Sequence, residues 1–329
     1  MTGQSGARRT NRHSRAGLWR LWAALAPAVF VTGAFGQPGP IVTWGLGGFS
    51  SPPPPTGLFT AVSAGGGDHA LAIRDNGTLV QFGANGPTGV PTGTFSTIAA
   101  GTGHNLALRS NGTVVGWGDN SWGQTTPPQE PFVAIAAGEN HSLGLRADGT
   151  VAGWGSNYFG LNIWAGQATP PPGAFISIDA AYWYSAGVRT DGSLAFWGLD
   201  AFGLPHVPPG TFTDVALGVN FGVALRTDGT LSAWGTNDYG QLNVPPGEFL
   251  AIAAHGFTGL GLRTDRTLVA WGSAVPGLLI PPAGQFSAIT AATYYGVAIA
   301  IPSPGALALL GAAGVLALAP RRRARASRG

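Results

Sequence analysis

The chain has 329 residues, of which 44% are hydrophobic and only 9% are charged, with 54 glycines, 26 prolines and no cysteine. The lack of cysteine excludes disulfides, thiolate zinc sites and a cysteine nucleophile. All 17 basic residues are arginine, so a Schiff-base lysine and a phosphate loop of the G-x-x-x-x-G-K type are also excluded. This much glycine and proline, without a three-residue period, favours short strands joined by turns over long helices.

The charges are distributed unevenly along the chain. Ten arginines lie at the two ends, five among the first 20 residues and five among the last nine, whereas all 14 acidic residues lie between Asp68 and Asp265. That central part contains seven arginines, so its net charge is −7. Because such a body repels phosphate backbones, we expect no nucleic-acid partner.

Residues 1–36 have the features of an export signal. Arginines near the start are followed by an apolar stretch from Leu21 to Val31, and Ala34-Phe35-Gly36 fits a small-x-small cleavage pattern. A first transmembrane helix is the alternative, but the stretch is short and Pro27 interrupts it. We therefore expect a signal helix and an exported protein, with the general secretory and twin-arginine routes both open.

One unit of about 37 residues recurs seven times between residues 41 and 300. Each unit has two markers, an aromatic-Gly pair and a phenylalanine before a run of small apolar residues. The aromatic residues of the pairs are Trp44, Phe82, Trp117, Trp154, Trp197, Trp234 and Trp271. The phenylalanines are Phe59, Phe95, Phe132, Phe175, Phe212, Phe249 and Phe286.

Within a unit the pattern predicts three strands. In the third complete unit these are the apolar run of residues 132–138, an alternating segment from His141, and residues 150–155. Asp148-Gly149 predicts a tight type I′ hairpin between the last two, with a positive φ at both central residues. The same turn is expected at Asn76-Gly77, Asn111-Gly112, Asp191-Gly192 and Asp228-Gly229, and with a strained arginine at Asp265-Arg266.

The two ends of the array complement each other. The first marker strand, Ile41 to Gly45, lacks preceding strands, and the last unit, 286–301, lacks its aromatic-Gly strand. Units this short have no room for crossover helices, and lone antiparallel sheets must stack to cover their faces. We predict an all-β, seven-bladed β-propeller over residues 37–301, closed by pairing of the N- and C-terminal strands, with the marker tryptophans and Phe82 between blades.

The repeated residues also carry a family resemblance. Gly138-x-x-His141-Ser-Leu-x-Leu, Asp148-Gly149-Thr-Val-x-x-Trp154-Gly155 and Asn237-x-x-Gly240-Gln241-Leu resemble the regulator of chromosome condensation repeat. The resemblance covers about 260 residues and implies a seven-bladed propeller. The compact units with Pro-Pro loops are more similar to the secreted bacterial type, that of beta-lactamase inhibitory protein II, than to the nuclear exchange factors. Since one fold hosts many activities, the resemblance implies no single function.

Histidines recur at one position of three successive units. These are His69, His104 and His141, and later units have Tyr184, Phe221, Thr258 and Tyr295 there. A metal site is one interpretation, but two nitrogens on one zinc lie no more than about 4 Å apart, closer than equal positions of adjacent blades. We therefore expect histidines that cap backbone groups inside each blade, and no metal or other cofactor.

The acidic residues outside the turns show no spacing that singles out a catalytic pair, and no G-x-S-x-G motif is present. We therefore expect a protein that is not an enzyme. The alternative is an extracellular polysaccharide-acting hydrolase or lyase that uses acidic residues in a propeller cleft.

Aromatic residues in the loops after the aromatic-Gly strands are the candidate binding residues. Repeated positions point to one rim of the ring, and irregular insertions mark functional faces. The candidates are Trp122, Tyr158, Phe159, Phe202 and Tyr239 at the repeated position, Trp164 in the unit lengthened to 43 residues, and the following Tyr182, Trp183 and Tyr184. They either bind a protein or a glycan, or wedge between blades as structural plugs. We predict a monomeric, non-catalytic binding scaffold.

Residues 302–329 form a separate C-terminal segment. Pro302-Ser303-Pro304 precedes an uncharged apolar run from Ala306 to Ala319 and a terminal arginine cluster. Fourteen helical residues span about 21 Å, less than a hydrocarbon core of about 30 Å. The tail resembles PEP-CTERM sorting signals, which implies an apolar helix, transient membrane association and a processing protease. We expect a protein of the cell envelope or outer surface, or one secreted after tail processing.

Overall fold

The computed structural model describes residues 37–45, 54–66, 69–160, 162–199, 204, 206–272, 275 and 277–302. In this part of the chain all regular secondary structure is β-strand, and no membrane-spanning helix is found there. The predicted signal helix in residues 1–36 and the predicted apolar helix of the sorting segment lie outside the described residues.

Three-stranded antiparallel sheets recur along the chain. In six of them the first strand begins at or just after the marker phenylalanine and the third ends on the aromatic-Gly pair. Their strands are β2 (Phe59–Ala64), β3 (His69–Arg74) and β4 (Leu79–Gly83); β5 (Thr97–Ala100), β6 (His104–Leu108) and β7 (Val114–Gly118); β8 (Ala134–Ala137), β9 (His141–Leu145) and β10 (Val151–Gly155); β13 (Phe175–Ala181), β14 (Tyr184–Arg189) and β15 (Leu194–Gly198); β16 (Phe212–Leu217), β17 (Phe221–Arg226) and β18 (Leu231–Gly235); and β19 (Phe249–His255), β20 (Thr258–Arg263) and β21 (Leu268–Gly272).

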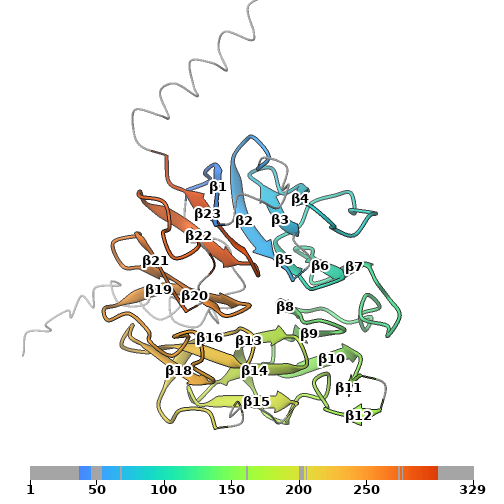
Figure 1. Cartoon of the computed structure of the whole chain (residues 1–329). Coiled ribbons are helices and arrows are strands. Elements are labelled where there is room, and N and C mark those ends of the chain that lie inside the picture. The colour runs from blue at the N-terminus through green and yellow to red at the C-terminus, as the bar shows by residue number, and fades with distance from the viewer. Residues whose placement is uncertain are drawn as a thin grey trace, which may run out of the picture.

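A seventh three-stranded sheet joins the two ends of the array. β22 (Phe286–Ala291) and β23 (Tyr295–Ala300) pair with each other, and β1 (Ile41–Gly45) pairs with β23 from Ile41 opposite Ile299 to Gly45 opposite Tyr295. The predicted pairing of the terminal strands is therefore present, and Figure 1 shows blue β1 beside red-orange β23. The first strands contact one another in series from β2 to β22, and β22 contacts β2, so the sheets surround a common axis as the blades of a β-propeller.

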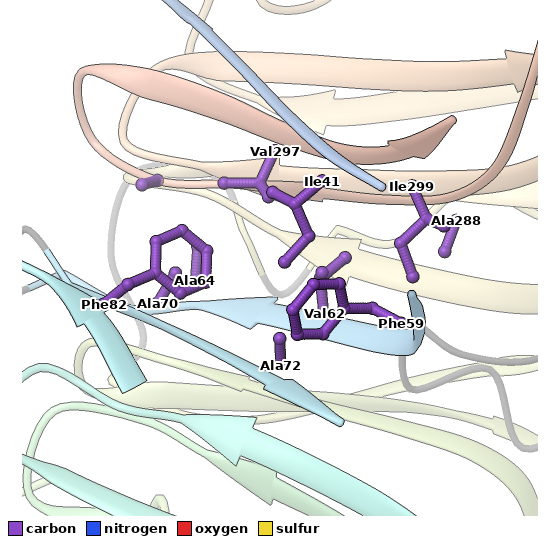
Figure 2. Packing of buried hydrophobic residues seen from close by; sticks show 11 residues of the cluster. Ile41, Phe59, Val62, Ala64, Ala70, Ala72, Phe82, Ala288, Val297 and Ile299 are labelled. Atoms are coloured by element: carbon purple, nitrogen blue, oxygen red, sulfur yellow. The ribbon is translucent and has the colours of Figure 1, made fainter. Parts of the chain in front are cut away.

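Apolar side chains pack between adjacent blades. At the junction of the first and last units, Ile41, Val297 and Ile299 meet Phe59 and Val62 in one buried cluster, and Figure 2 shows these side chains pointing toward one another. The marker tryptophans from Trp117 onward are buried in similar clusters, while Trp44 is half-buried. Burial of this kind between sheets is the driving force that holds a ring without disulfides together.

The turns between second and third strands differ from the predicted type I′ geometry. Positive φ is found at Gly149, 84°, and not at Asp148. Gly149 N donates to Arg146 O, and Arg146 N donates to Thr150 O, which is the three-residue loop with a type I turn and a glycine bulge. The Asp148 carboxylate accepts bonds from the Thr150 N–H and hydroxyl at 2.9 and 2.7 Å, which stabilises the loop. Arg266 takes the glycine position with a φ of 68°.

The ring has two faces, set by where the strands end. On one, the residue after the aromatic-Gly pair bonds to the turn between first and second strands in four blades, as Ser156 N does to Asn140 O. We call this the aromatic face; it comprises the turns at residues 101–103, 138–140, 182–183, 218–220, 256–257 and 292–294 and the segments at 119–124, 156–160, 162–165 and 236–241. The opposite face holds the turns between second and third strands and the starts of the first strands. We call it the arginine face, after Arg74, Arg109, Arg146, Arg189, Arg226 and Arg263.

Candidate functional site

A small hairpin projects from the longest unit on the aromatic face. Its strands β11 (Tyr158–Phe159) and β12 (Ile163–Trp164) pair with Tyr158 opposite Trp164. These two rings form an edge-to-face pair with centroids 5.4 Å apart, yet 40% of Tyr158 and 61% of Trp164 remain exposed. The Asn157 carbonyl accepts bonds from the N–H groups of Ala165 and Gly166, which fixes the base of the hairpin. The inserted segment therefore presents a fixed pair of aromatic rings to solvent.

The next aromatic residues connect this hairpin to the following blade. Phe159 packs edge-on against Trp183 at 4.6 Å, and Trp183 lies 6.0 Å from Tyr182. Tyr182 in turn packs against His255 at 5.7 Å, at the mouth of the central channel. Its φ of 39° is uncommon for a residue with a bulky side chain. Half-buried aromatic side chains thus form a continuous row from the hairpin to the axis of the propeller, and they support the exposed pair of Tyr158 and Trp164.

Two further loops repeat this arrangement. Tyr239 is 52% exposed and packs on Phe257 of the next blade at 4.8 Å, and Trp122 is 42% exposed. Buried glutamines hold both loops, since Gln124 Oε1 accepts a bond from Trp122 N at 2.9 Å and Gln241 Oε1 accepts one from Tyr239 N at 2.7 Å. The backbone carbonyls of the same two glutamines accept hydrogen bonds from the indole N–H groups of two marker tryptophans, Trp154 and Trp271. The buried scaffold therefore fixes where these aromatic residues stand.

Tyr184 does not belong to the exposed surface, which corrects its prediction as a binding residue. It is only 2% exposed, its hydroxyl donates to Gly218 O, and that hydroxyl accepts a bond from Asn220 N at 2.9 Å. Burial raises the pKa of Tyr184. Tyr184 begins the second strand of its blade, where its side chain bonds to the next blade. Phe202, predicted alongside it, lies outside the described residues.

The three repeated histidines also occupy this inter-blade position. His69, His104 and His141 bond through Nε2 to Asn105, Ser142 and Ser185 of the next blade at 2.8, 2.9 and 2.8 Å. The predicted capping of backbone groups inside one blade is therefore wrong, because the imidazoles connect neighbouring blades.

The protonation of two of these histidines follows from their partners. Ser142 and Ser185 donate their single hydroxyl protons to Gln124 O and Gln167 O, so Nε2 of His104 and His141 must donate. Burial lowers the pKa of His104 to about 4 and that of His141 to about 3, which keeps both neutral. In the described part of the chain, no three or more His, Cys, Asp or Glu side chains gather as a metal site needs.

The central channel is a cavity of about 100 Å³ lined largely by alanines of the first strands, with Asp179, Tyr182 and His255. The Asp179 carboxylate accepts a bond from Leu217 N at 2.7 Å, and burial raises its pKa to about 7. Asp214, 2% exposed, accepts bonds from the Ser177 hydroxyl and from Val215 N, and burial raises its pKa to about 8. Such a channel has room for several water molecules but is smaller than ordinary ligand pockets, and Asp214 is out of reach of a polysaccharide.

The fold and the hydrogen bonds between neighbouring blades place this protein in the class of β-propellers built from repeated three-stranded blades. Three segments, residues 95–124, 132–161 and 212–241, match the model of the regulator of chromosome condensation (RCC1) repeat. Over these segments the chain is similar to the RCC1 repeat.

Solved structures show the same fold. The ectodomain of the receptor kinase CR4 from Physcomitrella patens has a TM-score of 0.62 and 23% identity, covering 73% of this chain and 70% of its own. Prp20p from Saccharomyces cerevisiae, described with its binding to Gsp1p and histones, has a TM-score of 0.67 and 16% identity over 86% and 97% of the two chains. Yeast Prp20 bound to Kap60 has a TM-score of 0.65 and 15% identity, covering 93% of this chain and 99% of its own. No curated protein shows significant sequence similarity to this chain.

Proposed function

We propose that this protein is an exported, non-catalytic binding scaffold, a closed seven-bladed ring whose aromatic face docks a partner protein. The exposed Tyr158–Trp164 pair on the β11–β12 hairpin carries the proposal. Large exposed aromatic residues are costly to leave in water, and held rigidly they are the typical anchors of protein interfaces. Trp122 and Tyr239 extend the same face.

The support for a protein partner comes from shape and from relatives. The exposed aromatic side chains lie on separate loops around the propeller, and the central channel between these loops is too small for a sugar chain. Yeast Prp20p, which shares the fold, is described with its binding to Gsp1p and histones, and a second structure has Kap60 bound to it. A rigid ring also lowers the entropy lost on association, because its loops are ordered before binding.

The positions of the two described chain ends support an aromatic face that is accessible at the cell surface. Gly39 pairs with Phe59, and Ile301 N donates to Gln285 O, so both described ends lie on the arginine face. If residues 303–329 hold the protein at a membrane until a processing protease acts, as the PEP-CTERM resemblance implies, the aromatic face points away from that membrane. The same face would then be open to partners outside the cell.

The test is capture of envelope proteins by the tagged full-length chain, read by quantitative mass spectrometry. Trp164→Ala and Tyr158→Ala should each reduce the partner's recovery at least several-fold, because both remove an anchor ring. Leu250→Ala removes an exposed apolar side chain from the arginine face and should leave recovery unchanged. Equal recovery with all variants would overturn the proposal.

Two further probes decide the partner class. Binding to a glycan array that depends on Trp164 would keep the surface and replace the protein by a glycan. Titration against beta-lactamases tests the special case in which the partner is a secreted enzyme and docking inhibits it, as the compact bacterial type implies.

A further inference from the structure

The two faces of the ring differ in charge. All seven arginines of the described residues lie on the arginine face, six at the ends of second strands or directly after them and Arg266 in a turn. The same face carries seven acidic residues and is therefore balanced: Asp75, Glu130, Asp148, Asp191, Asp228, Glu248 and Asp265.

These arginines are already engaged within their own blades. Each of the six strand-end guanidinium groups lies over the marker phenylalanine of its blade, with 4.9 to 6.0 Å between the guanidinium carbon and the ring centre. Arg146 also pairs with Glu130 at 2.7 Å, and Arg189 donates to Pro172 O. The charges of the arginine face therefore serve the fold.

The aromatic face, in contrast, carries only acidic charge among the described residues. Asp119, Glu139 and Asp238 lie there, and its described segments contain no arginine. His255, at the channel mouth, has its pKa lowered to about 4 by burial and is therefore neutral. The net charge of this face is negative.

Each of these acids stands beside a candidate aromatic residue. Asp238 directly precedes exposed Tyr239, Asp119 lies in the loop that carries Trp122, and Glu139 N donates to Tyr182 O. Exposed aromatic rings attract cations through their π-faces, and a one-sign acidic surface steers cations toward them. Anionic lipid surfaces and nucleic acids are repelled by the same field.

We infer that the partner of this face is a basic protein segment rich in lysine and arginine. The inference rests on the proposed function and names its partner class. Apolar stems of such side chains pack on the exposed aromatic rings of this face, while their charged ends lie near Asp119, Glu139 and Asp238. Both described chain ends leave from the opposite, arginine face, and the proposed partner is a second molecule.

The experiment uses fluorescence anisotropy with the full chain and two labelled 20-residue peptides, one of Lys, Arg, Leu and Ala, the other with Glu in place of each cation. Only the cationic peptide should bind, and added NaCl should weaken its binding through screening. Asp238→Asn with Glu139→Gln should weaken it by roughly two- to fivefold per charge. Asp75→Asn with Glu248→Gln removes the same charge from the arginine face and should change nothing.

The outcomes separate this inference from the proposed function. Equal binding of both peptides, lost in Trp164→Ala, would overturn the basic partner and leave the aromatic face as the docking surface. Both proposals would be contradicted if the cationic peptide binds equally well to Trp164→Ala and if both pairs of charge substitutions weaken its binding to the same extent. Unfolding midpoints of all variants, measured in parallel, show that each chain is folded.

Discussion

The arginine face and the aromatic face are built from the same repeats but use their side chains differently. On the arginine face, charged residues bond within their own blade: Arg189 lies over Phe175, and the Asp148 carboxylate closes its turn. On the aromatic face, rings such as Trp164 stand in solvent on buried supports. One end of each strand therefore holds the repeat together, whereas the other end is free to vary for recognition.

The largest expected effect separates a buried tryptophan from an exposed one. Trp234 is buried between blades and its indole donates to Leu204 O at 3.0 Å, so Trp234→Ala should lower the free energy of unfolding by about 3–5 kcal/mol. Trp164→Ala, on the aromatic face, should change it by no more than about 0.5 kcal/mol. Urea unfolding followed by circular dichroism measures both, and comparable losses would erase the distinction between scaffold and binding surface.

The next effect concerns pH and the buried carboxyl of Asp214. Its folded pKa of about 8 lies above the ordinary 3.8, so its stabilising contribution is complete below about pH 3.8 and is lost as pH rises through 8. The buried histidines have lowered pKa values, so their contribution is lost only as pH falls below 6.5. Above pH 6.5 the change in the free energy of unfolding with pH therefore comes from the buried carboxyl groups alone.

The free energy of unfolding should therefore fall by about 2 kcal/mol between about pH 6.5 and pH 8.5. Asp214→Asn should remove most of this slope. Asp228→Asn is the matched control on the arginine face, because bonds from Thr230 lower the pKa of Asp228 and keep its titration outside the window. Burial also raises the pKa of Asp179 to about 7, so a small slope below about pH 7 should remain, whereas an undiminished slope in Asp214→Asn would show that Asp214 is not responsible.

A smaller effect tests the correction at Tyr184. Tyr184→Phe removes the hydroxyl that bonds to Gly218 O and Asn220 N, so it should cost about 1–2 kcal/mol of unfolding free energy. Partner recovery should stay unchanged. Reduced recovery at unchanged stability would return Tyr184 to the binding surface.

The sequence predicts the repeats, the strand order and the pairing of β1 with β23, because marker spacing and missing strands depend on chain order alone. It missed the partner of each repeated histidine, since the distance to the next blade depends on how the ring closes. One signal was available: Tyr184 occupies the register position of His141, and both turn out to reach the next blade.

The turn type and the supports of the site were also missed, for local reasons. Asp-Gly pairs occur both in type I′ turns and in three-residue loops with a glycine bulge, and the length of the loop distinguishes the two. Gln124 and Gln241, which hold the aromatic loops, recur after a loop glycine, so their repetition could have identified them. The hairpin pairing of Tyr158 with Trp164 depends on the geometry of one irregular insertion, which no repeat specifies.

Hydrogen–deuterium exchange on the full chain, with and without the captured partner, tests most directly that the aromatic face is the binding face. On binding, exchange should slow in residues 156–165, 182–183 and 236–241 and stay unchanged in the turns at 146–150 and 226–230. Slower exchange in those turns of the arginine face, with the hairpin unaffected, would contradict it.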